Sequence, residues 1–343
     1  DVVSHMTEHM KILPKTMQVG LKFAACLGPK FDRKALEKAR KDNEFEDSFL
    51  KSCIEFGFLQ NFGSNQYVWA HDQIQQAAYD LIPLPKRKSL HLLVGTRLLT
   101  TTSPSDMEHM IFLIVDNMNL GSKLIDDPGQ KYEVSQLNLE AGEKALTAST
   151  FHSAAKYLLT GLSLLGPESW EVKYNLTIKL YDAASEALFV TGDFSRLSTM
   201  IDEPLMNARS FEDKLNIFNN LVRALAASSR FEEGIAKCMS ILSQLGEVIP
   251  TDITADIYAD EVAQVKQLLH DKSREELLSL PMMSKTQKLA AMQFLNHALY
   301  MTSIAKPLLM PIIGLRMVKM SIEYGICNMS AFAFACYGAF LVC

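Results

Sequence analysis

The sequence contains few of the residues that break helices. Its 343 residues include only 16 glycines and 12 prolines, and both residue types interrupt regular helix. Hydrophobic residues make up 48% of the chain and charged residues 21%, which is the balance of a folded globular protein. The composition therefore excludes a disordered chain and predicts a mainly helical protein of about two domains.

An excess of positive charge is also missing. The formal net charge is −5 at pH 7, whereas a surface that binds nucleic acid is rich in lysine and arginine. We therefore expect no nucleic acid partner.

Cysteine pairs of the Cys-x-x-Cys type are absent, so neither a metal-binding spacing nor a disulfide framework is present. We expect reduced thiols, most of them in the core, and a cytoplasmic location. The six cysteines are Cys26, Cys53, Cys238, Cys327, Cys336 and Cys343.

The chain has no hydrophobic run long enough for a membrane span. Its final apolar stretch, "CNMSAFAFACYGAFLVC", offers roughly 16 apolar positions, short of the roughly 20 that a bilayer requires. We expect a buried helix here and no membrane contact. Because the chain starts without methionine and stops within this run, we also expect it to be a segment of a longer protein.

Motifs that hold a phosphate or a catalytic serine are missing as well. The sequence has no G-x-x-x-x-G-K-[ST] loop, no G-x-G-x-x-G after a strand and no G-x-S-x-G elbow. We therefore predict no catalytic residues and no cofactor within this segment.

Apolar residues recur at helical spacing along most of the chain. One example follows Ser103, which can cap a helix that has Pro104 in its first turn. The apolar face of that helix is formed by Met107, Met110, Ile111, Ile114, Val115 and Met118.

Residues 56–70, "FGFLQNFGSNQYVWA", depart from this pattern and predict a β-hairpin around "GSN". We expect helices at 2–13, 15–27, 32–42 and 45–56 before the hairpin, and at 73–82 and 85–101 after it. Helices with one small hairpin are typical of a winged-helix-like domain, which we place at residues 1–102. A connecting helix and linker would occupy residues 103–130.

Residues 131–343 predict tetratricopeptide-like helical repeats that stack into an α-α superhelix. Three segments each place a small or polar turn before a phenylalanine that begins a helix, with spacings of 43 and 37 residues. These phenylalanines are Phe151, Phe194 and Phe231.

Two alternative functions start from the N-terminal residues. "HMTEH" matches the H-x-x-E-H pattern of some zinc peptidases through His5, Glu8 and His9, although no third ligand has a recognisable context. A DNA-binding winged helix with a helical-repeat tail is the other alternative. Its reading helix would be residues 45–56, whose acidic side chains outnumber the single Lys51 and would repel phosphate.

"AHDQIQQAAYDLI" joins the hairpin to the next helix. We expect Asp72 to cap that helix and Gln75 to complete a capping box. Ile74, Ala77, Ala78 and Leu81 would form its buried face. His71 has two open interpretations, a buried and satisfied histidine or a side chain with a functional role.

The run through Trp69, His71, Asp72, Gln76 and Tyr79, followed by "LIP" and "KRKSLHLLVGTRLL", resembles the winged-helix part of STAND-type signal-transduction ATPases. It is most similar to the predicted-ATPase module of multidomain signalling proteins with protein-kinase-like and histidine-kinase segments. "LKFAACLGPKFD" and "LNLEAGEKALTASTFHSAAKYLLTGLSLL" extend the resemblance to most of residues 1–250.

The resemblance implies a role for His71. In STAND proteins a Met-His-Asp motif places its histidine against the β-phosphate of ADP and holds the resting state; here Ala70 replaces the methionine. His71 would then be an ADP phosphate sensor, acting with a nucleotide-binding core that this segment lacks. ATP and ADP would be cofactors of the parent protein, and the segment would regulate signalling and bind protein partners.

Overall fold

The computed structural model describes residues 2–40, 46–250 and 252–342. The chain divides into two compact units, Asp1–Ala183 and Ala184–Cys343. Both are mainly helical, and one small β-sheet lies in the first unit. The predicted fold class, mainly α with a small β element and helical repeats, is confirmed. The domain boundaries at residues 102 and 130 stay predictions.

Five helices form the N-terminal part of the first unit. They are α1 (Val2–Ile12), α2 (Lys15–Cys26), α3 (Arg33–Arg40), α4 (Glu46–Glu55) and α5 (Asp72–Asp80). Helix α5 packs against both α1 and α2, with Ala77 and Ala78 fully buried as predicted. The predicted ends of two helices at residues 42 and 45 lie outside the described residues.

The sheet has three strands where the sequence predicts two. Strands β2 (Leu59–Asn61) and β3 (Gln66–Trp69) form the predicted hairpin, and β1 (Lys30–Asp32) pairs with the other edge of β3. Strand β1 is three residues long, too short to show an alternating pattern. The predicted hairpin is confirmed, and β1 is an additional strand that the sequence did not predict.

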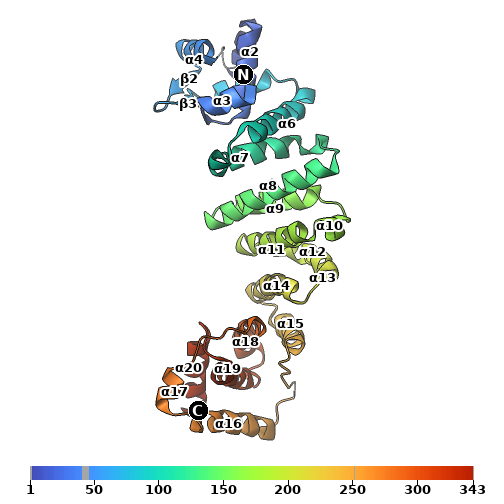
Figure 1. Ribbon diagram of the computed structural model, residues 1–343, viewed down its shortest axis with the longest axis vertical. Coiled ribbons are helices and arrows are strands. Elements are labelled where there is room, and N and C mark those ends of the chain that lie inside the picture. The colour runs from blue at the N-terminus through green and yellow to red at the C-terminus, as the bar shows by residue number, and fades with distance from the viewer. Residues whose placement is uncertain (1, 41–45, 251, 343) are drawn as a thin grey trace. The chain divides into compact units, whose positions relative to one another are not determined.

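After α5, the first unit continues with further helices. They are α6 (Leu84–Thr101), α7 (Pro104–Gly121), α8 (Pro128–Thr147), α9 (Phe151–Leu164), α10 (Ser169–Val172) and α11 (Tyr174–Val190), within which the two units divide. Helix α6 pairs with α7, and α8 pairs with α9. Helices α6 to α9 lie side by side in chain order (Figure 1). A Cβ at Gly142 would lie 2.5 Å from Leu158, so a glycine is needed where α8 and α9 approach.

The second unit continues with shorter helices and a final bundle. It contains α12 (Phe194–Met200), α13 (Asp202–Asn207), α14 (Leu215–Ala227), α15 (Phe231–Gln244), α16 (Ala255–His270), α17 (Arg274–Leu278), α18 (Thr286–Ala305), α19 (Met310–Tyr324) and α20 (Ser330–Val342). Helix α19 packs against α16, α18 and α20. Ala333 and Tyr337 of α20 are buried, and no described helix is both long and apolar enough to cross a bilayer.

The three predicted phenylalanine turns share one backbone geometry. Each phenylalanine begins a helix, α9, α12 or α15. The residue two positions earlier has a positive φ, which is 56° at Ser149, 75° at Gly192 and 57° at Ser229. The residue that follows this positive-φ residue donates its backbone N–H to the carbonyl oxygen of the residue five positions earlier, at 2.9–3.0 Å. These bonds make each turn a Schellman motif, so the repeat detected in the sequence is a repeat of structure.

Replacing Gly192 with alanine should destabilise the protein by about 1 kcal/mol, because a Cβ disfavours its left-handed backbone. The same change at Gly338 is a matched control, since Gly338 lies within α20 with open space at its Cβ position. Gly338→Ala should stabilise by about 0.5–1 kcal/mol. Urea unfolding measures the change in the free energy of unfolding for each variant. Changes of the same sign and size in the two variants would contradict the turn geometry.

Candidate functional site

His71 lies where β3 gives way to α5. Its backbone is extended, with φ −157° and ψ 148°, and its Nδ1 accepts a hydrogen bond from the Gln73 N–H at 3.2 Å. His71 is therefore the N-cap of α5, and the predictions of Asp72 as the cap and Gln75 as its capping-box partner were wrong. Asp72 instead occupies the first helical turn, where the helix dipole favours a carboxylate.

The ring of His71 faces solvent. The residue is exposed, so the interpretation of a buried, satisfied histidine was wrong. Because Nδ1 accepts from a backbone N–H, the neutral ring carries its proton on Nε2. Nε2–H is thus a hydrogen-bond donor that the cap leaves free to meet a ligand.

The other residues of the motif hold this corner in place. Trp69 is only 7% exposed, and its Nε1 donates to the Gly28 carbonyl at 3.1 Å. Gln76 is exposed and donates to Asp80 Oδ1 at 2.9 Å. The indole therefore fixes the strand that leads to His71, and Gln76 remains on the surface of α5.

Tyr79 begins a chain of buried and partly buried hydrogen bonds. Asn117 Nδ2 donates to the Cys26 carbonyl at 3.2 Å and to the Leu113 carbonyl at 2.9 Å, so its Oδ1 is free to accept from His91 Nδ1 at 2.8 Å. With its proton on Nδ1, the His91 ring accepts from the Tyr79 hydroxyl at Nε2, 2.9 Å away. This relay joins α5 to α6, α7 and the end of α2.

Charge and burial around the relay favour the neutral form of His91. Burial lowers the pKa of His91, an effect that the hydrogen bond to Asn117 opposes and the nearby Arg87 charge reinforces. Arg87 also pairs with Asp80 at 2.7 Å and lies 4.6 Å from the centre of the Tyr79 ring. His91 and Asn117 were not predicted from the sequence, although each is a polar residue among apolar ones on its helix.

Tyr79→Phe should cost about 1–2 kcal/mol of stability, because it leaves the buried His91 Nε2 without a donor. Tyr300→Phe is the matched control. Tyr300 is 57% exposed, so the loss of its hydroxyl should change stability by less than about 0.5 kcal/mol. Thermal unfolding compares the two, and equal costs would show that the relay adds nothing.

His5, Glu8 and His9 lie on the exposed side of α1. The Nε2 atoms of the two histidines are 3.1 Å apart, and Glu8 pairs with Lys11 at 2.7 Å. Within the described ranges, no group of three or more His, Cys, Asp or Glu residues is arranged to hold a metal. The pair thus has no third ligand at hand among these residues.

A second histidine with a shifted pKa, the half-buried His297, lies in the second unit. Burial, reinforced by the nearby charge of Arg223, lowers the pKa of His297 to about 4. Its Nε2 donates to Asn219 Oδ1 at 2.7 Å, and Gln293 Nε2 donates to the same oxygen at 2.9 Å. His297 is therefore a neutral link between α14 and α18.

His297 should make the second unit sensitive to acid. A histidine in an unfolded chain has a pKa near 6.5. As the pH falls from about 6.5 towards 4, His297 therefore binds a proton in the unfolded chain but stays neutral in the folded protein. Stability is then highest above about pH 6.5 and decreases by on the order of 2 kcal/mol across this window, with solvent screening allowed for. His297→Gln retains an amide donor and should flatten this part of the stability profile measured by urea unfolding; an unchanged slope would contradict the assignment.

Comparisons with known proteins give partial likenesses. No protein-family model matches the chain. It is 24% identical to "Hybrid signal transduction histidine kinase G" of Dictyostelium discoideum over 60% of its length, and this match spans 7% of that kinase. The chain is also similar to the crystal structure of a STAND protein with a tetratricopeptide repeat sensor from Pyrococcus horikoshii, with 11% identity and a TM-score of 0.29. This match covers 92% of the chain and 49% of that protein. A TM-score this low does not establish a common fold.

Proposed function

We propose that this chain is a non-catalytic regulatory and protein-interaction segment of a larger STAND-type ATPase signalling protein. Its winged-helix-like part, α1 to α5 with the sheet, would close on a nucleotide-binding core supplied by other residues. The helical hairpins would present a surface to protein partners. Likeness to a hybrid histidine kinase over 60% of the chain supports a place in kinase-linked signalling. The location we propose for the segment is the cytoplasm.

The observation that carries this proposal is the geometry of His71. Its exposed ring is oriented by the backbone of α5 through Nδ1 and presents Nε2–H outward. An imidazole N–H is a suitable donor to a phosphate oxygen, and a bond between such groups is lost when the two domains separate. His71 would thus sense bound ADP, the cofactor of the parent protein, and this segment would hold no cofactor of its own.

His71→Ser tests the proposal in the full-length protein, because serine keeps an N-cap acceptor for α5 and removes the imidazole. Losing one hydrogen bond to a charged group is worth about 1.5–3 kcal/mol. Fluorescent ADP should therefore leave the variant at least about tenfold faster than it leaves the native protein.

Gln76→Ala provides the control, since Gln76 is exposed on the same helix. It should release ADP at the native rate. Native release from folded, ADP-loaded His71→Ser would refute the sensor role, and ATP turnover by residues 1–343 alone would refute the non-catalytic assignment.

A further inference from the structure

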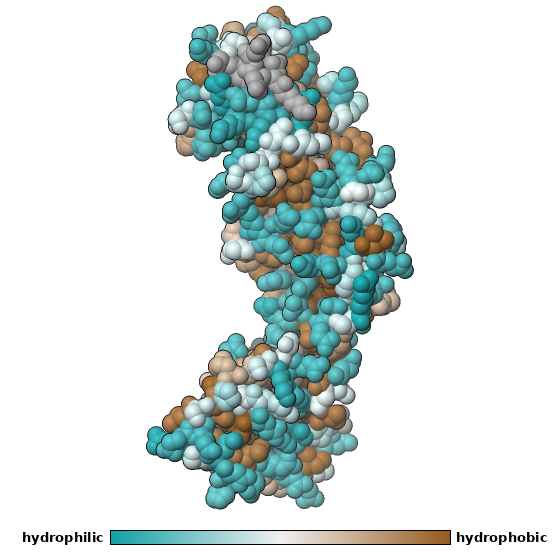
Figure 2. Space-filling model, viewed as in Figure 1, coloured by the Kyte–Doolittle hydropathy of each residue, from teal (hydrophilic) through white to brown (hydrophobic). Residues whose placement is uncertain are grey.

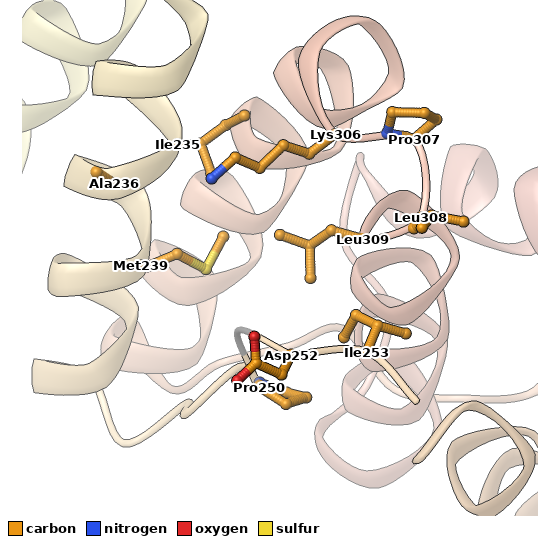
Figure 3. Close-up of a pocket in the computed structure, with 10 residues that line it drawn as sticks. All are labelled: Ile235, Ala236, Met239, Pro250, Asp252, Ile253, Lys306, Pro307, Leu308 and Leu309. Carbon is orange, nitrogen blue, oxygen red and sulfur yellow. The ribbon is translucent and has the colours of Figure 1, made fainter. Parts of the chain in front are cut away.

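The second unit contains a pocket of about 660 Å³. One wall is α15, which contributes Ile235, Ala236 and Met239 (Figure 3). The opposite wall is the turn between α18 and α19, and residues from the segment before α16 close the lower side. The described residues of this lower side and of the turn are Pro250, Asp252, Ile253, Lys306, Pro307, Leu308 and Leu309.

The wall formed by the turn is held by its backbone. Lys306 N–H donates to the Thr302 carbonyl at 2.9 Å, and Leu309 N–H donates to the Lys306 carbonyl at 2.9 Å. Pro250 and Pro307 have fixed φ angles, so two segments that line the pocket lose little freedom on binding. Met239, by contrast, is a side chain that adapts its shape to an apolar ligand.

Among the described residues that line the pocket, Lys306 and Asp252 alone have charged side chains. In Figure 3 they lie on opposite sides of the pocket, with Met239 and Leu309 between them. Both are exposed, and neither side chain forms a hydrogen bond or ion pair with the described part of the chain. The pocket therefore has an apolar centre with a positive and a negative rim.

This chemistry suits a protein segment better than a small metabolite. Small-molecule sites orient their ligand with a few buried polar groups, and the side chains that line this pocket offer only the two exposed charges. An apolar centre with a charged, solvated rim is instead the arrangement of a protein interface. Leu308 is 78% exposed at the edge of the pocket, which adds apolar surface for such a partner. Figure 2 shows hydrophobic residues interspersed with hydrophilic ones on the face that it draws.

We propose that this pocket binds a short segment of a partner protein. The segment inserts bulky apolar side chains into the pocket. An acidic residue on one side of these apolar residues faces Lys306, and a basic residue on the other side faces Asp252. The apolar centre supplies the affinity, and the two rim charges set the direction in which the segment lies. This inference rests on the proposed role of the helical hairpins as a protein-binding surface and names the chemistry of the partner.

The test is a selection from a displayed library of random 16-residue peptides on the chain of residues 1–343. Selected peptides should share apolar residues bracketed by an acidic and a basic position. Ala236→Arg fills the pocket from an exposed position of α15 and should weaken their binding at least about tenfold. The matched control is Ala335→Arg, at an exposed position inside α20, which should leave binding unchanged.

The direction of binding is tested by the rim charges. Lys306→Glu or Asp252→Lys should each weaken the selected peptides about threefold at low salt, the modest effect of an exposed ion pair. The double variant Lys306→Glu/Asp252→Lys should favour peptides with the acidic and basic positions exchanged. The pocket assignment would be overturned if the selected peptides bound Ala236→Arg as tightly as the native protein, or if the selection enriched no peptide. The ADP-release experiment on His71 is independent of either result, so it shows separately whether the proposed function fails.

Discussion

The left-handed turn that joins α8 to α9, α11 to α12 and α14 to α15 is the constraint on which the middle of the repeat part depends. A single hairpin cannot bury its apolar face, so each one must be held in a shape that its neighbour can cover. The Schellman bonds at Ser149, Gly192 and Ser229 supply that shape, because they end one helix and start the next within three residues. The turn before Phe231 also positions α15, which forms one wall of the pocket in the second unit.

Buried polar side chains fix the order in which the helices of the first unit pack. Asn119 and Asn138 exchange two hydrogen bonds of 2.8 Å between α7 and α8. The relay from Tyr79 through His91 to Asn117 similarly joins α5 to α6 and α7. Unsatisfied amide and imidazole groups are costly when buried, so these bonds disfavour other pairings. Because α5 carries His71 at its N-terminus, we expect a displacement of His71 to be transmitted to the first helical pair.

The sequence predicted those features that repeat or that extend over many residues. Periodic apolar positions located α7, with Ser103 at its N-cap as predicted, and the phenylalanine turns located the starts of α9, α12 and α15. Strand β1 escaped prediction because three residues carry no period. The cap of α5 was misassigned by one residue, since the sequence cannot show that His71 has extended backbone with its Nδ1 over the Gln73 N–H.

The buried relay and the pocket could not be predicted from the sequence. His91 and Asn117 are 26 residues apart, and only the packing of α6 on α7 brings them together. The pocket combines α15 with residues more than 50 positions away in the α18–α19 turn, so no local pattern marks it. His71 itself was detectable because a helix cap requires no ionisable residue beside it, whereas its exposure and its hydrogen bond to the Gln73 N–H depend on the fold.

The measurement that most directly tests the central claim is the reactivity of His71 towards diethyl pyrocarbonate in the full-length protein, with and without ADP. His109 and His152 are exposed residues of the same unit and serve as internal references. If the His71 ring meets bound nucleotide, ADP should protect His71 and leave the two reference histidines reactive. Equal modification of His71 with and without saturating ADP would contradict the account.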